Sequence, residues 1–528
     1  MTPALSRVAA PSRPRPPLFI LIPALVAGAS MLLPLVYLIL RAFEADLDVV
    51  QALVWRPRTL DLLINTLLLT FGVLIATTLM ALPLAWLAVF SDLKYKRVLT
   101  LLGALPLAIP GYVMAYALLG IGGHYGIMAQ VFNYPVPRLQ GYWGALIALS
   151  LYTYPYLFLN LRAALLGLDP SLQESARSLG YSSRQTFWRI TLPHLRPALL
   201  AGWLVISLYV LGDFGAVALM RYEVFSSAIF TQYSGAFDRI YAAWLSLLLL
   251  GLTLSFIFAD SLLLGSKRLA RTGTGAARTA VPVALGFYRP LAWLFLLLLF
   301  GVSLGLPALI IGYWLSLAPM LTDYPALLAT FLRSAGAAGP AALLAAAFAL
   351  PIAYLSVRYP SPLARTLDRL AYIGYAIPPL TLALALVFFS LRSAPWLYQT
   401  LPLLVIAYAL SFLALALGPI RSSLLQAKPS LEEAARSLGR SSFGAFSSVS
   451  LPLLRRGTLA GMTLVFIIAM KELPITFLLA PTGYTTLAVS VFSRTSEAML
   501  AEAAPFAAAI VLFSSLFIGL VLTYEGKR

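Results

Sequence analysis

The sequence of 528 residues contains no cysteine and only two histidines, His124 and His194. The absence of cysteine excludes disulfide bonds, thiolate catalysis, and zinc or iron–sulfur sites with cysteine ligands. Two histidines are too few for a histidine-rich metal site, and they make a Ser/His/Asp hydrolase a poor interpretation. The sequence also lacks a G-x-x-x-x-G-K-(S/T) phosphate loop. We therefore expect no catalytic residue, no bound metal and no cofactor in this chain, and no ATP hydrolysis by the chain alone.

Charged residues are also scarce, at 11%, whereas 61% of the residues are hydrophobic and the mean hydropathy is +0.89. No water-soluble globular domain sustains this composition over such a length. The composition predicts an all-α polytopic membrane protein with about twelve transmembrane helices, each of roughly 20 or more apolar residues. The expected spans lie near residues 19–40, 61–90, 98–121, 142–166, 198–220, 240–265, 290–316, 326–357, 367–390, 401–420, 457–480 and 501–524.

The net charge of +18 comes from 37 Lys and Arg against 19 Asp and Glu. When the segments between the expected spans are assigned alternately to two sides, 27 of the 37 basic residues fall on the side of the N-terminus and nine on the other side. The positive-inside rule predicts this asymmetry for a multi-pass protein with both termini in the cytoplasm. The charge therefore indicates topology, and we expect contact with membrane lipid but no nucleic-acid partner.

An internal repeat divides the chain into two halves. The segment SLQESARSLGYSSRQTFWRITLPHLRPALLAG at 171–202 recurs at 430–461 as SLEEAARSLGRSSFGAFSSVSLPLLRRGTLAG, at a constant offset of 259 residues. An earlier match, A-I-P at 108–110 and at 376–378, has an offset of 268 residues, so the first half has nine more residues in the loop after its third span. Because each half has six spans, both halves enter the membrane in the same direction, and a pathway is expected along their common axis.

The repeat predicts the domain boundaries. We expect a first half at 1–265, a linker at 266–289 and a second half at 290–528. The polar, basic loops at 167–197 and 426–456 occupy the same place in the two halves.

Each of these loops predicts a short helix. The helix is expected to start with a Ser-x-x-Glu capping box, to carry an i, i+3 ion pair from glutamate to arginine, and to end at a glycine in the left-handed conformation. In chain order these residues are Ser171, Glu174, Arg177 and Gly180 in the first copy and Ser430, Glu433, Arg436 and Gly439 in the second. A second short helix is expected to end at Leu192–Pro193 and at Leu451–Pro452, because proline interrupts helix hydrogen bonding.

The pattern E-(S/A)-A-R-x-L-G, followed twelve residues after the glycine by L-P, resembles the EAA motif of ABC importer permeases. Both copies fit, although Ser175 stands where the motif usually has alanine. The resemblance implies a type I ABC importer permease fold with both halves fused. It also implies two cytoplasmic ATP-binding subunits that use the ATP, and a soluble or lipid-anchored substrate-binding protein. The docking elements that it carries over are Glu174, Ala176, Gly180, Glu433, Ala435 and Gly439.

Ionisable residues within the spans are costly and need an explanation. Asp213 in LGDFGAV and Glu472 in MKELPIT are related by the 259-residue offset, so they could line the pathway as a pair. The alternative is that both acids bond to helix ends or backbone, with Lys471 neutralising Glu472. Pro110 and Pro378 free backbone carbonyls at matched places, which suits gate elements but also ordinary kinks that serve packing.

The segments that contain Asp213 and Glu472 also indicate a class of substrate. LGDFGAV, MKELPITFLLAP and the A-x-P elements resemble the iron(III) branch of these permeases, which predicts a bacterial inner-membrane permease for iron(III). Permeases for thiamine, putrescine, phosphonate or sulfate remain alternatives of the same class. An ion-coupled secondary transporter that uses Asp213 and Glu472 as carriers is the contrasting alternative. A further alternative is that the matched loops only cap helices and enforce topology.

Overall fold

The computed structural model describes residues 16–44, 47–236, 238–264, 282–318 and 323–525. These residues are predominantly helical, and within the described ranges the β structure is one isolated bridge between Ser91 and Val283. Most of the predicted linker, 266–289, lies outside the described residues. Its last part packs on the first half: Val283 exchanges backbone hydrogen bonds with Phe90 and Asp92, and Arg289 forms an ion pair of 2.7 Å with Asp92.

The first half contains α1 (Leu18–Ala42), α2 (Leu47–Val54), α3 (Pro57–Phe90), α4 (Lys96–Ala104), α5 (Gly111–Leu119), α6 (Ile127–Phe132), α7 (Gly141–Leu166), α8 (Pro170–Ser178), α9 (Ser183–Thr186), α10 (Leu192–Gly212), α11 (Gly215–Leu219), α12 (Phe225–Ser234) and α13 (Arg239–Leu264). The second half contains α14 (Arg289–Phe300), α15 (Leu306–Leu317), α16 (Tyr324–Arg358), α17 (Pro362–Ala376), α18 (Pro379–Ser393), α19 (Leu401–Ser411), α20 (Leu413–Gln426), α21 (Pro429–Ser437), α22 (Ser442–Ala445), α23 (Leu451–Met470), α24 (Pro474–Leu479), α25 (Leu487–Ser496) and α26 (Leu500–Glu525).

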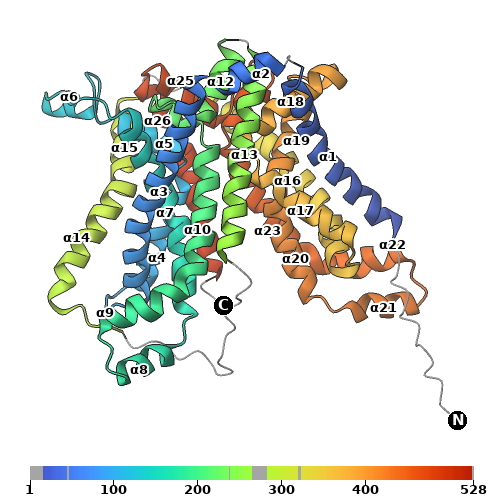
Figure 1. Ribbon diagram of the computed structural model, residues 1–528, viewed down its shortest axis with the longest axis horizontal. Coiled ribbons are helices and arrows are strands. Elements are labelled where there is room, and N and C mark those ends of the chain that lie inside the picture. The colour runs from blue at the N-terminus through green and yellow to red at the C-terminus, as the bar shows by residue number, and fades with distance from the viewer. Residues whose placement is uncertain (1–15, 45–46, 237, 265–281, 319–322, 526–528) are drawn as a thin grey trace. The chain divides into compact units, whose positions relative to one another are not determined.

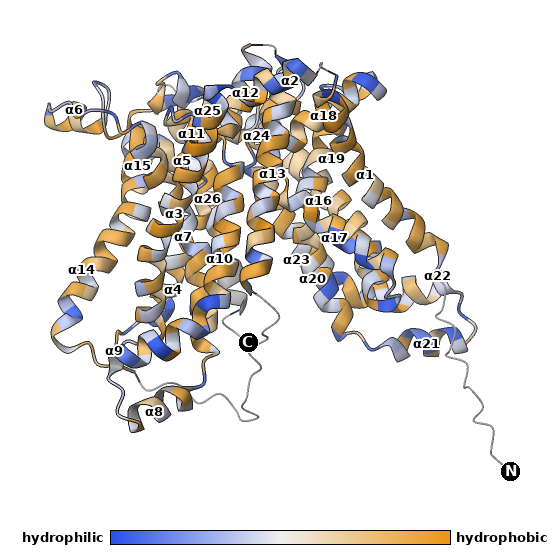
Figure 2. Cartoon of the chain, viewed as in Figure 1, coloured by the Kyte–Doolittle hydropathy of each residue, from blue (hydrophilic) through white to orange (hydrophobic). Residues whose placement is uncertain are grey.

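The spans agree in number with the sequence prediction. Nine helices of the described residues are long and apolar enough to cross a membrane, and three bent helix pairs raise the number to twelve. Apolar residues cover most of α3, α7 and α13, whereas hydrophilic residues gather on α8, α9 and α21 (Figure 2). The all-α polytopic fold with about twelve spans is confirmed.

The helices group into two compact units that do not coincide with the sequence halves. The larger unit comprises Tyr37–Gly336, Ala376–Leu404 and Met470–Arg528, and the smaller unit comprises Met1–Val36, Ala337–Tyr375 and Val405–Ala469. Within the larger unit, α8 and α9 lie at one end, and α5, α12 and α25 lie at the opposite end (Figure 1). Within the smaller unit, α21 and α22 lie close together at one end (Figure 1).

Each unit repeats one close helix contact. In the larger unit, α10 packs against α7 so closely that a Cβ on Gly202 would lie 2.5 Å from a methyl carbon of Leu157. In the smaller unit, a Cβ on Gly461 would lie 2.9 Å from Cα of Ala416, which is the residue matched to Leu157 at offset 259. The glycine after each matched loop therefore lets its span approach the preceding span, as small residues do in membrane helices.

Four predicted spans are broken near the place where the motifs predict function. The span expected at 98–121 bends by 88° between Ala108 and Gly111, at Pro110. The span expected at 367–390 is interrupted between α17 and α18, at Pro378. The spans expected at 198–220 and 457–480 stop at the ends of α10 and α23 and resume as the short helices α11 and α24. The interruptions at Pro110 and Pro378 agree with the predicted effect of these prolines. The breaks after α10 and α23 were not predicted, because hydropathy is insensitive to a break that neighbouring protein segments cover.

The predicted helix ends at Leu192–Pro193 and Leu451–Pro452 were also wrong. Both matched loops pass through a π-helical turn, at Phe187–Thr191 and at Phe446–Ser450, and continue directly into α10 and α23. The wider turn lets the N–H of Leu192 bond to the carbonyl of Phe187, five residues back. A helix can continue past a proline when such a local adjustment absorbs the missing hydrogen bond.

Candidate functional site

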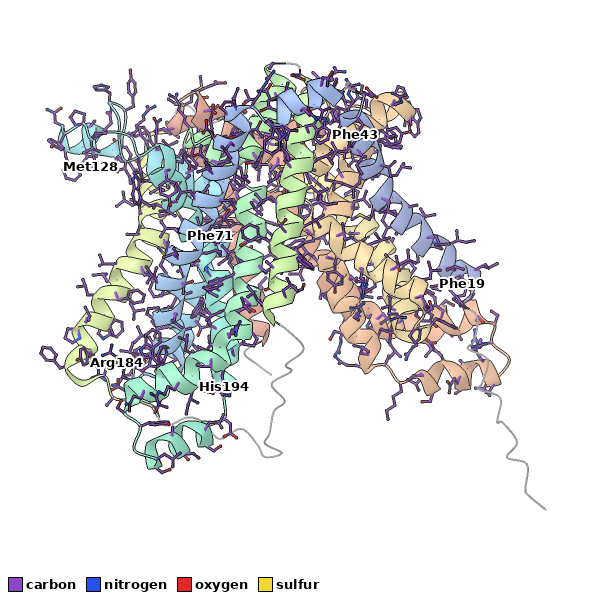
Figure 3. All side chains as sticks on the ribbon, in the orientation of Figure 1. Phe19, Phe43, Phe71, Met128, Arg184 and His194 are labelled. Carbon is purple, nitrogen blue, oxygen red and sulfur yellow. The ribbon has the colours of Figure 1, made fainter. Side chains whose placement is uncertain are left out.

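The first matched loop presents α8 with one buried face and one exposed face. Ala176 is 2% exposed, whereas Glu174 is exposed and the side chain of Leu179 is 78% exposed. The helix ends at Gly180, which has φ +87°, and the N–H of Tyr181 bonds to the carbonyl of Ala176 at 3.0 Å. This six-to-one bond around a left-handed residue is a Schellman motif. Arg184 and His194 follow at the same end of the larger unit (Figure 3).

The second matched loop repeats this geometry in α21. Gly439 also has φ +87°, and the N–H of Arg440 bonds to the carbonyl of Ala435 at 3.1 Å. Leu438, which matches Leu179, is 86% exposed, and Glu433 is exposed as well. The predicted left-handed glycine stops are therefore confirmed in both copies. Each helix therefore presents a largely exposed leucine beside a fixed helix end.

The predicted capping boxes were wrong. Each helix begins one residue earlier, at a proline, so that Asp169 and Lys428 occupy the N-cap positions. The carboxylate of Asp169 accepts the N–H of Ser171 at 3.0 Å, whereas Lys428 provides no side-chain cap. Proline is favoured at the first helical position because it has no N–H to satisfy, and here it moves the serine into the helix.

The predicted ion pairs are not supported in the second loop. Glu433 and Arg436 form no ion pair in the structure, and both side chains are exposed. The side chain of Arg177 lies outside the described residues, so the pair with Glu174 is not tested. An exposed pair on one helix contributes little, because water screens both charges.

A residue that the sequence reasoning missed, Glu432, fixes α21 to its surroundings within the smaller unit. Its carboxylate accepts hydrogen bonds from the hydroxyls of Tyr354 on α16, at 2.7 Å, and of Ser450 in the π-helical turn. The matched position in the first loop is Gln173. The sequence could have indicated this role, because consecutive residues such as Glu432 and Glu433 point from different sides of a helix. When Glu433 faces solvent, Glu432 can face inward.

The two predicted pathway acids both cap short helices at the breaks. Oδ1 of Asp213 accepts the N–H groups of Ala216 and Val217 at the start of α11, at 2.9 and 3.2 Å. Oε1 of Glu472 accepts the N–H of Ile475 at the start of α24, at 3.1 Å. Asp213 and Glu472 are partly buried and close enough to interact electrostatically. The repeat therefore brings two carboxylates together, each held by the N-terminus of a helix that favours negative charge.

One alternative predicted that Lys471 neutralises Glu472, and the structure contradicts it. Nζ of Lys471 donates to the carbonyl of Leu107 at 2.9 Å, and the hydroxyl of Tyr112 donates to the carbonyl of Lys471 at 3.1 Å. Lys471 and Glu472 both lie in the break between α23 and α24, where their side chains bond to different neighbours. The break at Pro110 leaves the carbonyl of Leu107 available, as predicted for a proline at this place.

The predicted prolines lie beside these carboxylates. Pro110 precedes Gly111, where a Cβ would lie 3.0 Å from Oδ2 of Asp213. Pro378 precedes Pro379, whose Cδ would lie 2.9 Å from a Cβ on Gly212. The larger unit thus brings together Asp213, Glu472, Pro110 and Pro378.

Four phenylalanines form a cluster next to the acids, and the sequence reasoning missed them. Phe214 follows Asp213 directly, and its ring centroid lies 4.8 Å from that of Phe230 and 5.4 Å from that of Phe492. Phe477 on α24 completes the cluster, with its ring 5.1 Å from that of Phe230. Phe214, Phe230 and Phe492 also line a cavity of 340 Å³ that contains Arg58 and Arg221. The sequence could have indicated two members of the cluster, because Phe230 and Phe492 occupy the same position in α12 and α25.

Few other functional groups are available near the breaks. Over the described ranges, no group of three His, Cys, Asp or Glu residues could hold a metal ion. The arrangement of broken helices, paired carboxylates and an aromatic cluster is suited to a transport pathway, because irregular backbone at membrane depth is tolerated only where it is buried in protein or lines a cavity.

Comparison with known families now identifies the class of protein. The model of the binding-protein-dependent transport system inner membrane component matches residues 75–268 and 338–525, one match in each half. This chain belongs to that family. It is accordingly a transport component rather than an enzyme, and a multi-pass protein of the inner membrane.

Individual relatives agree with this assignment. The chain is 34% identical over 521 residues to the Fe(3+)-transport system permease protein FbpB 2 of Haemophilus influenzae, covering 97% of this chain and 99% of the relative. It is 28% identical over 239 residues to the sulfate transport system permease protein CysT of Salmonella typhimurium, covering 43% of this chain and 85% of the relative. A match to the molybdenum transport system permease protein ModB of Escherichia coli K12 has 32% identity but covers 25% of this chain and 58% of the relative.

Proposed function

We propose that this chain supplies both transmembrane permease halves of an ATP-driven, binding-protein-dependent importer of iron(III). The observation that carries the proposal is the near full-length similarity to an Fe(3+) permease, which covers both halves. The sulfate and molybdenum permeases match shorter parts of the chain. They therefore support the transport class more than the substrate.

Two cytoplasmic ATP-binding subunits would dock on the two matched loops. The glycine ends at Gly180 and Gly439 fix α8 and α21, and each leaves an exposed leucine beside an exposed glutamate, Glu174 or Glu433. A helix end that is already fixed in shape lowers the conformational entropy lost on docking to a partner. The permease lacks a phosphate loop, so the partners would hydrolyse the ATP.

The arrangement also supports an orientation. With both termini cytoplasmic, α8 faces the cytoplasm, and the opposite end of the larger unit, with α12 and α25, receives a soluble or lipid-anchored binding protein loaded with iron. The excess of basic residues on one set of loops supports this orientation.

The pathway would lead past the phenylalanine cluster to Asp213 and Glu472. Iron(III) prefers hard oxygen ligands, and carboxylates supply them without cysteine or histidine. Because both acids already bond helix N-termini through one oxygen, they would hold the ion weakly and leave tight binding to the soluble receptor. Closure of the ATP-binding subunits would move the docked loops and shift the pathway between outward and inward opening by linkage.

The function is tested by reconstitution into liposomes with and without the ATP-binding subunits. We expect iron uptake only when the ATP-binding subunits, ATP and the iron-loaded binding protein are all present. Uptake driven by a proton or sodium gradient without the ATP-binding subunits would instead support a secondary transporter. Uptake of sulfate, thiamine, putrescine or phosphonate in place of iron would assign another substrate of the same class.

The pathway role is tested by the double variant Asp213→Asn with Glu472→Gln. Amide oxygens can still cap α11 and α24, so we expect the folded yield to stay near that of the wild type while iron uptake falls about tenfold or more through loss of charge. The measurement is initial iron uptake at constant ATPase activity. Asp48→Asn, an exposed position on α2, serves as control. Unchanged uptake in the double variant would limit the acids to helix capping.

A further inference from the structure

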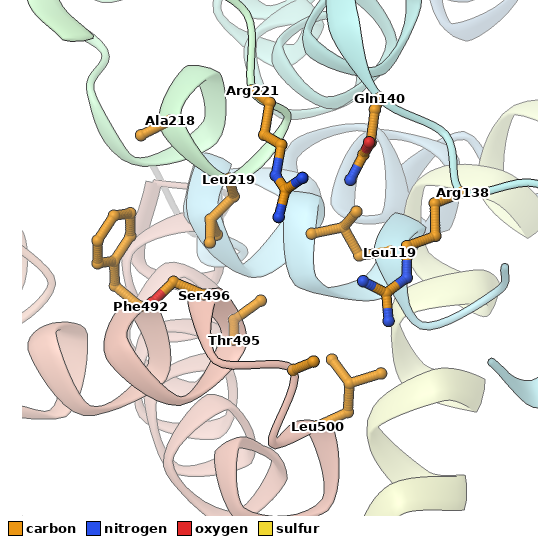
Figure 4. A pocket seen from close by; sticks show the side chains of 11 residues that line it. Leu119, Arg138, Gln140, Ala218, Leu219, Arg221, Phe492, Thr495, Ser496 and Leu500 are labelled. Atoms are coloured by element: carbon orange, nitrogen blue, oxygen red, sulfur yellow. The ribbon is translucent and has the colours of Figure 1, made fainter. Parts of the chain in front are cut away.

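A small cavity of 80 Å³ lies in the larger unit, at the end opposite α8. Arg138, Gln140 and Arg221 project into it from two separate segments (Figure 4). The apolar part of its lining includes Leu119 and Leu219, and none of the described residues that line it is acidic. A volume of this size holds several water molecules or one small ion, since a single water requires roughly 10–15 Å³ of such space.

Three arginines of the larger unit that do not line this cavity have acidic partners. Arg58 pairs with Glu223, Arg392 with Glu44, and Arg494 with Glu502. Within the described part of the chain, Arg138 and Arg221 have no acidic partner. Two guanidinium groups without counter-ions around one cavity create a local positive potential that favours an anion.

Arg221 stands where the second half has glycine. Arg221 has φ +54°, and Gly483 has φ +79°, and each precedes a tyrosine and lies four residues before the start of α12 or α25. The hydroxyl of Tyr222 donates to the carbonyl of Asn65, and that of Tyr484 donates to the carbonyl of Arg333. The two acceptors are related by the 268-residue offset, so the two positions are structural equivalents.

This equivalence indicates that the side chain of Arg221 is there for a reason other than folding. Glycine adopts positive φ without strain, whereas a residue with a Cβ does so at a cost in free energy. The first half accepts this cost, although the second half forms the same turn with Gly483. Strain retained at one copy of a repeat is a reason to look for a function of that side chain.

Arg138 comes from the part of the chain that is specific to the first half. It lies between α6 and α7, in the segment after α5 where the change of offset places nine additional residues. This loop is fitted around the arginine, because a Cβ on Gly123, which has φ +85°, would lie 2.6 Å from Nε of Arg138. Both guanidinium groups are therefore features of one half and absent from its repeat.

We propose that Arg138, Gln140 and Arg221 form a binding site for a small oxyanion of the phosphate, sulfate or carboxylate class. Arginine presents paired N–H donors that match two oxygens of such a group, and Gln140 offers a further amide donor. Arg221 also lines the 340 Å³ cavity, together with Phe214, Phe230 and Phe492 of the phenylalanine cluster. The anion would therefore bind beside the entrance to the pathway.

The site has a consequence for the substrate that rests on the proposed iron(III) function. A bare trivalent cation would be repelled by Arg138 and Arg221, which have no acidic partner among the described residues, before it reached Asp213 and Glu472. An ion that keeps an oxyanion ligand has a lower charge and brings the group that this site binds. The iron would thus enter as an oxyanion complex.

The test uses the full chain in lipid nanodiscs with its ATP-binding subunits, titrated with inorganic phosphate by calorimetry at low and high salt. The informative variant is Arg221→Gly, because the equivalent turn already contains glycine and the fold is expected to be retained. We expect saturable phosphate binding in the wild type, weaker at high salt, and at least tenfold weaker in Arg221→Gly and in Arg138→Ala. Arg392→Ala, which removes an arginine already paired with Glu44, should bind phosphate like the wild type.

Equal phosphate affinity in wild type and Arg221→Gly, or no saturable binding in the wild type, would overturn the site.

A parallel titration with acetate, and docking of the iron-free binding protein to each variant, distinguish a free anion from a carboxylate of the binding protein. Phosphate binding that is lost in Arg221→Gly while docking is unchanged supports the free anion. Docking that is lost while phosphate binding is unchanged contradicts the proposal. Iron uptake is measured separately, so a negative anion result leaves the iron function standing.

Discussion

The breaks after α10 and α23 are equivalent in sequence but are packed in different ways. In both, a span stops before an acid that caps the next short helix, Asp213 before α11 and Glu472 before α24. The residue before the acid differs. In the first half it is Gly212, which packs closely on Pro379, and in the second half it is Lys471, which reaches the carbonyl of Leu107.

This difference shows what the duplication kept and what it changed. The capped break is retained in both halves, because each short helix needs an acceptor for its first N–H groups. The packing has changed, since one side makes an apolar contact with a proline ring and the other makes a charge-assisted hydrogen bond to a carbonyl beside a proline. Both contacts join a broken helix of one half to a break of the other half, so the proposed pathway is supported by two different kinds of contact.

The largest effect is expected from Gly212→Val. A Cβ at this position would lie 2.9 Å from Cδ of Pro379, and a proline ring cannot rotate away. We expect a loss of stability of about 3 kcal/mol or more, as for severe overpacking, together with loss of iron uptake. The measurement is the thermal unfolding midpoint of the purified permease, followed by uptake in liposomes.

The matched control is Gly251→Val on α13, where a Cβ meets no atom within 4 Å. This variant should unfold within a few degrees of the wild type. A Gly212→Val protein as stable as the control would show that the contact with Pro379 can relax. Close packing at Gly212 would then not distinguish the first break from the second.

A smaller effect is expected from Lys471→Met. Methionine retains most of the side-chain volume but leaves the partly buried carbonyl of Leu107 without the Nζ donor, which costs about 1 kcal/mol. We expect a lower unfolding midpoint and a change in the rate of iron uptake, since the lysine holds the segment beside Pro110. Lys94→Met, at an exposed position outside the spans, controls for loss of positive charge. Equal stability of the two variants would contradict a supporting role for Lys471.

The sequence predicted the elements that depend on local patterns. Apolar length located the spans, and the left-handed stops at Gly180 and Gly439 follow from the conformational freedom of glycine. The sequence also paired Asp213 with Glu472, because the repeat fixes equivalent positions. These predictions require only the local residue pattern and the sequence offset between the two copies of the repeat.

The sequence did not predict what depends on neighbours distant in the chain. The breaks at Asp213 and Glu472 are tolerated because other helices cover them, and the partner of Lys471 is a carbonyl 364 residues away. The inward orientation of Glu432 requires Tyr354 and Ser450 to be in place. The helix starts at Pro170 and Pro429 were missed for a local reason, since proline at the first position took precedence over the capping box.

The smallest effect is expected at the N-caps of α8 and α21. Like the two breaks, these helices are equivalent in sequence but differ in their contacts. Asp169 caps α8, whereas Lys428 gives α21 no side-chain cap although its backbone, with φ −66° and ψ 128°, is compatible with one. Asp169→Ala should therefore destabilise α8 by about 1 kcal/mol, and Lys428→Asp should stabilise α21 by about 0.5–1 kcal/mol through an added acceptor and favourable charge at the helix N-terminus.

Hydrogen exchange measured by mass spectrometry on peptides covering 170–178 and 429–437 checks both changes. Each 1 kcal/mol corresponds to about a fivefold change in exchange rate, so Asp169→Ala should speed exchange in α8 and Lys428→Asp should slow it in α21, while the other helix in each variant stays unchanged. Because α21 is already held by Glu432, its gain from a cap should be smaller than the loss in α8. Equal and opposite changes would mean that the cap acts independently of Glu432, and that the two loops differ in their caps alone.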